Sequence, residues 1–429
     1  MVVGRGVDTL VLNIYYKDRN GKPYKQTIPD ELKEQLDAWK QAAIMAEEPI
    51  PIPLTFEGAS LHMYPNGAGK GQWRWLMCCD SINLLVSMGR FNGIAQVRLS
   101  SEYLWSCHNV DDAWLRVEMF VARFLNSRIY VQVSEAHLCV DIAGWDVEAI
   151  NQRRDFVSRS HKRSAYEVTD FTVEEFSYGL HRSGFHFSKG SSISCAIYDK
   201  TREIREESLK WWFHDLWQAN GWDGEKQPQV WRVEFRFKRE VLHELSVEDE
   251  FQGIEDAFQF SDRLQALWAY ACGHVGGGAD GLPDGWLRYV VPGADSNRSR
   301  WVTHLVWMEV QKAFAVLPDE EEDKSEVIRK RKRQASLDRA TAATVGYLSS
   351  MAAWLGCDGS RGEEADFLYM LHWLRERTPV YLGTRQRQFA KEVEKKRVRF
   401  ERQRQAEQEA PGFSEVVHTP HLSFVNGKP

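Results

Sequence analysis

Two short stretches of the chain combine a tyrosine with carboxylates and cations in patterns that suit chemistry on a phosphate. One stretch reads GFHFSKGSSISCAIYDKTRE and contains Tyr198; the other reads VWRVEFRFKRE and contains Glu234. A phenol, whose pKa is about 10, is a poor nucleophile at neutral pH unless a base or a metal ion assists it. A carboxylate can hold such a metal ion, and arginine or lysine can neutralise a phosphate. These residue types therefore favour a site for attack on phosphorus.

Strands are expected to position these residues, because runs of β-branched and aromatic residues surround them. The run VWRVEFRF alternates apolar residues with Arg232, Glu234 and Arg236, so the charged side chains share one strand face. The pattern predicts strands over 7–16, 92–99, 129–142, 178–187, 192–198 and 230–237, and helices over 29–48, 111–125, 200–218 and 384–409. Together they predict an α+β fold: a mainly antiparallel sheet with packed helices, followed by a mostly helical C-terminal region.

The two stretches together resemble the Rep-trans family, which comprises replication initiators of rolling-circle plasmids and phages and is related to the relaxases of conjugative elements. The resemblance rests on a glycine turn between strands at Gly190, on the block Ile-Tyr-Asp-Lys over 197–200, and on Arg-x-Glu-x-Arg over 232–236. The strands that carry Asp8 and Asp141 support it. It covers roughly residues 5 to 245. The chain departs from the family at Ala196, where members commonly have arginine.

The resemblance implies tyrosine transesterification on DNA, with Tyr198 as the nucleophile. Nicking would leave a 5′-phosphotyrosine link and a free 3′-OH that a host polymerase extends, and the reverse step would rejoin the strand. A covalent intermediate suits such a reaction, because it conserves the energy of the phosphodiester bond.

A divalent cation, Mg²⁺ or Mn²⁺, is the predicted cofactor, because it would polarise the phosphate and stabilise the leaving 3′-oxygen. Asp141 and Glu234 are the candidate ligands, since Mg²⁺ prefers oxygen ligands. Arg232, Arg236 and Lys200 are expected at the catalytic site, where they would neutralise the scissile phosphate.

Each of these residues also has a purely structural interpretation. Tyr198 could cover the edge of the core, Glu234 could form cross-strand ion pairs on a solvated face, and Asp141 could cap a helix. The sequence has no His-hydrophobe-His triplet of the kind many DNA-nicking enzymes use to bind a metal ion. His137 and His186 are interpreted as strand histidines with satisfied hydrogen bonds, and as metal ligands only in the alternative.

DNA contacts are predicted on local basic surface, because the net charge of −6 excludes a generally basic protein. The predicted DNA-binding residues are Arg153, Arg154, Lys162, Arg163, Lys189, Arg397 and Arg399. The alternative for the C-terminal basic helix is a solvated face.

Other classes of protein are disfavoured by simple counts. The seven cysteines form no CxxC pair, which argues against a disulfide framework and a structural zinc site. No GxxxxGK[ST] motif is present, so strand separation is expected to depend on a host helicase. No long apolar run or signal peptide is recognised, which predicts an intracellular protein with no membrane partner. The resemblance to the Rep-trans family implies in addition a bacterial cytoplasmic protein associated with the nucleoid.

The predicted organisation is a nicking domain over 1–245, a helical domain over 246–410 that could bind DNA, and a disordered tail over 411–429. The predicted function is that of a rolling-circle replication initiator that nicks and rejoins origin DNA, acting on duplex and single-stranded forms. The alternatives are a conjugative relaxase with the same chemistry and a non-catalytic origin-binding or regulatory protein. Whether the chain forms a homodimer is left open.

Overall fold

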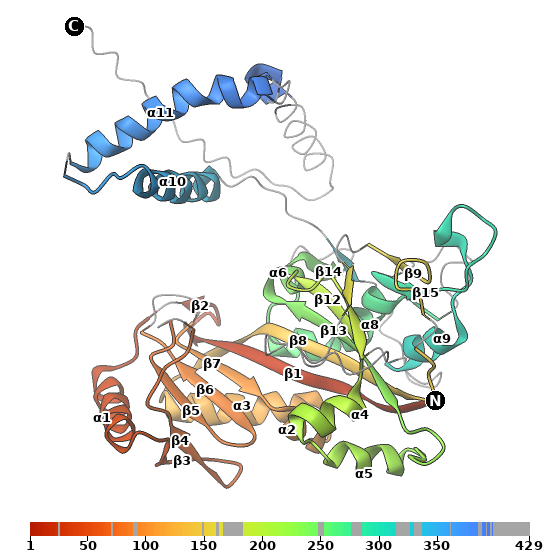
Figure 1. Ribbon diagram of the computed structural model, residues 1–429. Helices are drawn as coiled ribbons and strands as arrows, with labels where there is room; N and C mark the ends of the chain where they lie inside the picture. Colours follow the sequence, from red (N-terminus) through yellow and green to blue (C-terminus); the bar gives the residue numbers. More distant parts are fainter. Residues whose placement is uncertain are drawn as a thin grey trace, which may run out of the picture. The chain divides into compact units, whose positions relative to one another are not determined.

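The structure is a computed structural model in which two compact units, residues 1–330 and 331–429, can be distinguished. It describes residues 1–24, 26–69, 72–88, 93–147, 150–159, 163–165, 183–247, 253–275, 285–314, 327–329, 337–360, 362–384, 388–391, 393–394 and 397 (Figure 1). The domain boundary predicted at residue 245 falls inside the first unit. The tail predicted over 411–429 lies outside the described residues.

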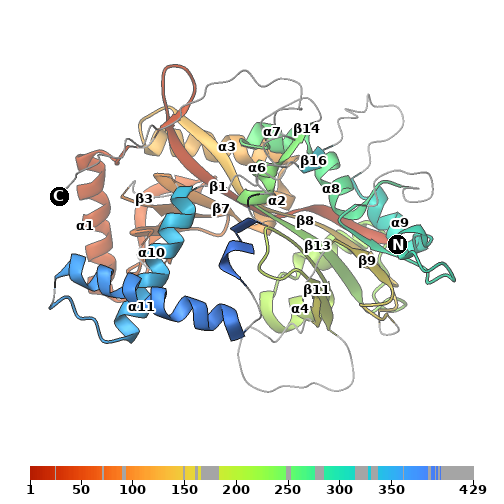
Figure 2. The same cartoon turned by 90° about the horizontal axis from the view of Figure 1, so that it is seen from above.

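An antiparallel sheet is the framework of the first unit. Its strands are β1 (Val2–Lys17), β2 (Pro23–Tyr24), β3 (Ile50–Phe56), β4 (Ala59–Met63), β5 (Trp75–Cys78), β6 (Ile82–Val86), β7 (Ala95–Leu99), β8 (Ile129–Ala143), β10 (Arg163–Ala165), β11 (Gly184–Phe187), β12 (Ile193–Asp199) and β13 (Val230–Lys238). The order across the sheet is β10-β11-β12-β13-β8-β1-β7-β6-β5-β4-β3, and β2 pairs with β1. In Figure 2 the long strands β1, β8 and β13 run side by side near the middle.

Helices cover both faces of this sheet. Those of the first unit are α1 (Asp30–Ala46), α2 (Ser101–Ser106), α3 (Val110–Phe124), α4 (Lys200–Glu203), a π-helical turn (Ile204–Ser208), α5 (Trp212–Ala219), α6 (Arg239–Glu244), α7 (Ala257–Asp262), α8 (Leu264–Cys272), a 3₁₀ turn (Arg298–Arg300) and α9 (Leu305–Lys312). Two pairs of short strands complete the unit: β9 (Phe156–Ser158) with β15 (Leu287–Tyr289), and β14 (Leu245–Val247) with β16 (Val327–Arg329). The α+β fold predicted from the sequence is confirmed.

The core lies on the apolar face of the central strands. Alternation along β13 places Phe235 on this face, where its ring lies edge-on to Trp268 of α8, with centroids 5.3 Å apart, and 6.4 Å from Trp307 of α9. All three side chains are fully buried. Helices α8 and α5 lie on opposite sides of the long strands (Figure 1). The segment that follows β13 therefore closes the core of the sheet, which explains why it belongs to the first unit.

The second unit contains α10 (Leu337–Trp354) and α11 (Glu363–Thr384), which contact each other. The basic helix predicted over 384–409 lies largely outside the described residues. In the described part of the chain, no helix is both long enough and apolar enough to span a bilayer.

Most elements around the predicted site form where the sequence pattern places them. The predictions for 7–16, 92–99, 129–142, 192–198 and 230–237 are confirmed by β1, β7, β8, β12 and β13, and those for 29–48 and 111–125 by α1 and α3. The helix predicted over 200–218 is interrupted instead. Leu209 adopts a left-handed conformation with φ of 54°, which ends the π-helical turn before α5 begins.

Candidate active site

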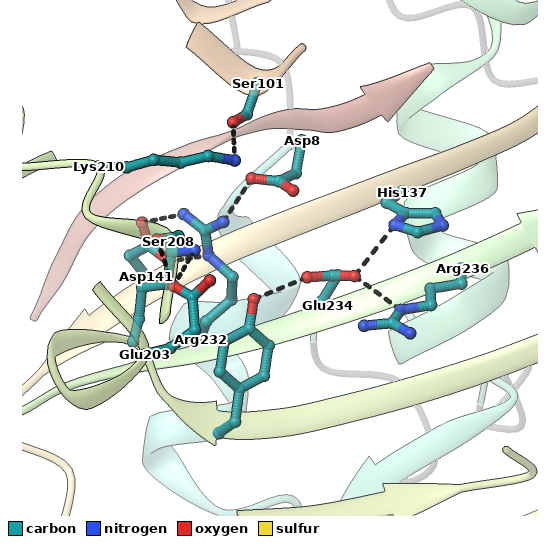
Figure 3. A network of polar contacts seen from close by, with 12 residues as sticks. Asp8, Ser101, His137, Asp141, Glu203, Ser208, Lys210, Arg232, Glu234 and Arg236 are labelled. Carbon is teal, nitrogen blue, oxygen red and sulfur yellow. Dashed lines mark hydrogen bonds and ion pairs between the residues drawn. The ribbon is translucent and has the colours of Figure 1, made fainter. Parts of the chain in front are cut away.

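The register of three neighbouring strands brings most of the predicted site residues together. Tyr198 of β12 pairs with Arg232 of β13, and Arg232 pairs in turn with Asp141 of β8. Since residues two apart share a strand face, Glu234 and Arg236 lie on the same face as Arg232. Figure 3 shows this polar face, with charged side chains converging on the guanidinium of Arg232 and on the carboxylate of Glu234. The face has two centres, one around each of these groups.

The hydroxyl of Tyr198 donates a hydrogen bond to Oε2 of Glu234 over 2.9 Å. Tyr198 is only 5% exposed. Its burial, and after that the neighbouring Glu234, raise the pKa of the phenol well above its ordinary value of 10.0, although Arg232 acts in the opposite direction. The resting side chain is therefore a neutral phenol with its proton directed at a carboxylate.

Glu234 is held as a buried anion. Its Oε1 accepts a hydrogen bond from Nε of Arg236 over 2.7 Å and lies 3.1 Å from Nδ1 of His137 (Figure 3). Burial alone would raise the pKa of Glu234, but Arg236, His137 and Arg232 together place it well below its ordinary value. The ionised carboxylate accepts the phenol hydrogen bond in the geometry required of a general base, whereas its lowered pKa opposes transfer of that proton in the resting site.

His137 lies between two carboxylates. Its Nδ1 faces Glu234, and its Nε2 lies 2.6 Å from Oε1 of Glu135 on the same strand. Burial lowers the pKa of His137, but the hydrogen bonds to Glu135 and Glu234 raise it more, so the net shift is upward. The interpretation of His137 as a strand histidine with satisfied hydrogen bonds is confirmed. Its link to Tyr198 was missed, although Glu135 and His137 alternate on the strand that ends near Asp141.

Arg232 forms the second centre of the polar face. Its Nε and Nη2 donate to Asp141 over 2.6 and 2.8 Å, and its Nη1 donates to Asp8. Asp141 also accepts a hydrogen bond of 3.0 Å from Nε1 of Trp217 in α5. Arg232 and Asp141 are both completely buried. The guanidinium thus ties β13 to β8 and β1 and is buried from solvent in this structure, and its predicted contact with a phosphate stays a prediction. Asp141 caps no helix.

The surroundings of the two carboxylates do not fit a divalent cation. Both oxygens of Asp141 accept hydrogen bonds from Arg232, and both oxygens of Glu234 are also occupied by donors. A metal ion at Asp141 would have to displace a positive charge. Among the described residues, no group of three or more His, Cys, Asp or Glu side chains is arranged to hold a metal ion. Asp141 and Glu234, which the sequence predicts as ligands of a divalent cation, therefore do not fit that role in this structure.

Lys200 lies beside the tyrosine but is itself paired. Asp199, at the end of β12, caps α4 by accepting a hydrogen bond from the amide of Arg202, which places Lys200 at the first position of the helix. The Lys200 ammonium contacts Glu203 at 2.5 Å and lies 5.8 Å from the ring centroid of Tyr198. Lys200 is almost completely buried. Its positive charge is therefore near the phenol but is matched by a carboxylate.

Four of the predicted DNA-binding residues are described with their side chains, and each is exposed. Arg153, Arg154 and Lys189 are exposed, and Arg154 pairs with Asp155. Arg397 is also exposed and lies 3.1 Å from Glu394. Lys162, Arg399 and the side chain of Arg163 lie outside the described residues.

Comparison with known proteins shows distant likenesses. No protein-family model matches the chain. An uncharacterized protein, ORF430 of Pseudomonas phage Pf1, is 27% identical over 192 residues, and the match covers 39% of this chain and 43% of that protein. The chain thus spans less than half the length of this curated relative. A rolling circle replication initiator protein from Geobacillus stearothermophilus is similar in structure with a TM-score of 0.38 and 12% identity, over 72% of this chain and 96% of that one. Likeness at this level does not define a family, so the function has to be inferred from the site.

Proposed function

We propose that the chain is a replication initiator of the rolling-circle type that nicks one DNA strand by attack of Tyr198 on a phosphodiester. The observation that carries the proposal is the hydrogen bond of 2.9 Å from the Tyr198 hydroxyl to an ionised, buried Glu234. A phenol oxygen becomes a competent nucleophile when a base takes its proton during the attack. The resemblance of the stretches around Tyr198 and Glu234 to the Rep-trans family supports the same assignment.

The proposed reaction needs no external redox partner and balances in protons. As the bond from the phenol oxygen to phosphorus forms, the phenol proton passes to Oε2 of Glu234 and the bond between phosphorus and the 3′-oxygen breaks. The leaving 3′-oxygen takes up a proton from water, so a free 3′-OH and a 5′-phosphotyrosine result; in the reverse reaction the attacking 3′-OH returns that proton to water. Rejoining is the reverse reaction, with the 3′-OH attacking the phosphotyrosine and Glu234 returning its proton to Tyr198.

A non-catalytic DNA-binding function is the second candidate, and the burial of Tyr198 favours it. A phenol that is 5% exposed serves as nucleophile only if DNA binding uncovers it. The buried ion pairs of Arg232 with Asp141 and Asp8 would hold the strands together equally well in a protein that only binds an origin. A conjugative relaxase would use the same chemistry as the initiator, and the site geometry is the same for both.

The test is a nicking assay on supercoiled plasmid that carries the origin, incubated with Mg²⁺ or Mn²⁺ and in parallel with EDTA. We expect open circles and a protein–DNA link that survives denaturation. Tyr198→Phe should abolish both. The matched control is Tyr103→Phe, because Tyr103 is also buried but its hydroxyl donates to the backbone oxygen of Ala113.

The outcomes separate the candidates. Nicking that persists in Tyr198→Phe would remove the proposed nucleophile. Origin binding without nicking in either metal would support the non-catalytic function. Cleavage that continues in EDTA would show that the predicted cation is not needed, whereas loss of cleavage in EDTA would show that a metal binds somewhere in the protein–DNA complex.

A further inference from the structure

The two oxygens of the Glu234 carboxylate have unequal surroundings. Oε1 faces two donors, Nε of Arg236 at 2.7 Å and Nδ1 of His137 at 3.1 Å. Oε2 receives the hydroxyl of Tyr198. Rotation of a glutamate carboxylate about its last torsion is soft, so side-chain packing alone does not fix which oxygen faces the tyrosine. Two donors on one oxygen do fix it.

The two donors approach Glu234 from different strands. Arg236 is two residues further along β13, on the same face as Glu234. His137 lies on the neighbouring strand β8, where it pairs with Arg236. Figure 3 shows the imidazole and the guanidinium directed at the same oxygen of Glu234. A rigid sheet therefore defines the plane of the carboxylate from two directions.

The orientation of the His137 ring is itself fixed by a third residue. Glu135, two residues before His137 on β8, places Oε1 at 2.6 Å from Nε2 of the ring. The side chain of Glu135 is 31% exposed, whereas those of His137 and Glu234 are 9% and 3% exposed. The pKa of Glu135 is lowered by its hydrogen bond to His137 and, to a smaller extent, by the positive charges of Arg98 on β7 and Lys238 on β13. With both ring nitrogens engaged by carboxylates, the imidazole has one favourable orientation.

We propose that His137, held by Glu135, is a positioning residue that keeps Oε2 of Glu234 directed at the Tyr198 hydroxyl. The inference rests on the proposed nicking function, since it assigns a role to residues behind the base of that reaction. His137 touches neither DNA nor the reacting atoms; it acts only through Glu234. A base displaced by a fraction of an ångström loses much of its effect, whereas DNA affinity does not depend on the direction of this carboxylate.

The test separates the rate of chemistry from DNA binding. His137→Leu removes both hydrogen bonds, and His137→Gln retains one donor toward Glu234. We expect His137→Leu to lower the single-turnover nicking rate by about 10–100-fold, the usual effect of removing such a supporting hydrogen bond. Its Kd for origin DNA should stay within about twofold of the parent value, since the substitution should slow the chemical step without changing how DNA binds before that step. His137→Gln should recover part of the rate.

Controls keep the proposal refutable. Should His137→Leu fail to fold, as judged by its unfolding curve, the comparison of Glu135→Ala with Glu135→Gln takes its place, and Glu135→Ala should be the slower. His62→Gln is the matched control, because His62 is an exposed histidine on β4 in another part of the sheet.

Three results would overturn the proposal. An undiminished rate in folded His137→Leu, or in Glu135→Ala where that pair is used, overturns the positioning role alone. A loss of rate matched by an equal loss of DNA affinity shows a structural role instead. A parent protein that does not nick overturns the proposed function and the positioning role together.

Discussion

Replacement of Asp141 by alanine tests whether this carboxylate stabilises the fold rather than holding a metal ion. Asp141 and Arg232 are both 0% exposed, and three hydrogen bonds end on Asp141, two from Arg232 and one from Trp217. Removing one partner of a buried ion pair costs about 3–5 kcal/mol, because the remaining charge is left without compensation. Asp8 still accepts from Arg232 in the variant, so we expect a loss near the lower end, about 3 kcal/mol.

The measurement is urea unfolding followed by circular dichroism, with the free energy of unfolding compared between parent and variant. A loss of about 3 kcal/mol is a large fraction of the roughly 5–15 kcal/mol that stabilises a typical domain. The control is Glu309→Ala, which breaks an exposed pair with Lys312 on α9 at 2.8 Å and should cost about 1 kcal/mol or less.

A double-mutant cycle isolates the pair itself. Asp141→Asn combined with Arg232→Met removes both charges, so the double variant should lose less free energy of unfolding than the sum of the single losses, with a coupling of about 2 kcal/mol. A loss below about 1 kcal/mol in Asp141→Ala, with nicking abolished, would refute this reasoning and return Asp141 to the role of a metal ligand.

Four further expectations concern charge and backbone. Because the pKa of Glu234 is lowered by folding, its contribution to stability is present above its ordinary pKa of 4.5 and is lost as the pH falls; Glu234→Gln should therefore flatten the decrease of unfolding free energy with acid, and an unchanged slope would contradict this. Burial, followed by Arg236 and Lys189, lowers the pKa of His186 to about 4, so NMR should show a neutral ring at pH 6, and a charged one would contradict the burial. Gly184→Ala should destabilise the protein, since its Cβ would lie 2.4 Å from a backbone oxygen of β12; an unchanged unfolding midpoint would contradict that close approach. Removing the charges of Arg397 and Arg399 should make the salt dependence of DNA binding shallower, by about 0.9 in log–log slope for each phosphate that is no longer neutralised, and an unchanged slope would assign them to solvent.

The strands of the site were predictable because their alternation is strong. Residues over 230–237 alternate charged and apolar side chains, and that period alone places Arg232, Glu234 and Arg236 on one face. This strand, β13, pairs with β8, which lies far from it in the sequence, and no local sequence pattern predicts such a pairing. The order of strands in the sheet could therefore not be predicted from the sequence.

The ion pairs and the burial of the site residues were less predictable from the sequence than the identity of those residues. A sequence shows that Asp141 and Arg232 are charged, but not that they face each other with no water between them. The partner that completes the cluster, Trp217, comes from α5, which follows Asp141 far along the chain, and no local pattern predicts their hydrogen bond. Glu135 was not predicted as a site residue, because an acid near a histidine on a strand is common on solvated surfaces.

The long strand β1 imposes an order of events on the making of this protein. It leaves the ribosome well before its main partner, β8, with which it pairs from Val2 and Ile142 onward. At synthesis rates of about 5–20 residues per second, β1 waits on the order of 10 s for that partner. During this time the edge that will pair with β8 is open to other chains, a recognised route to aggregation. Truncated products that stop before β8 should therefore accumulate as insoluble material, and slower growth at low temperature should favour recovery of the complete chain.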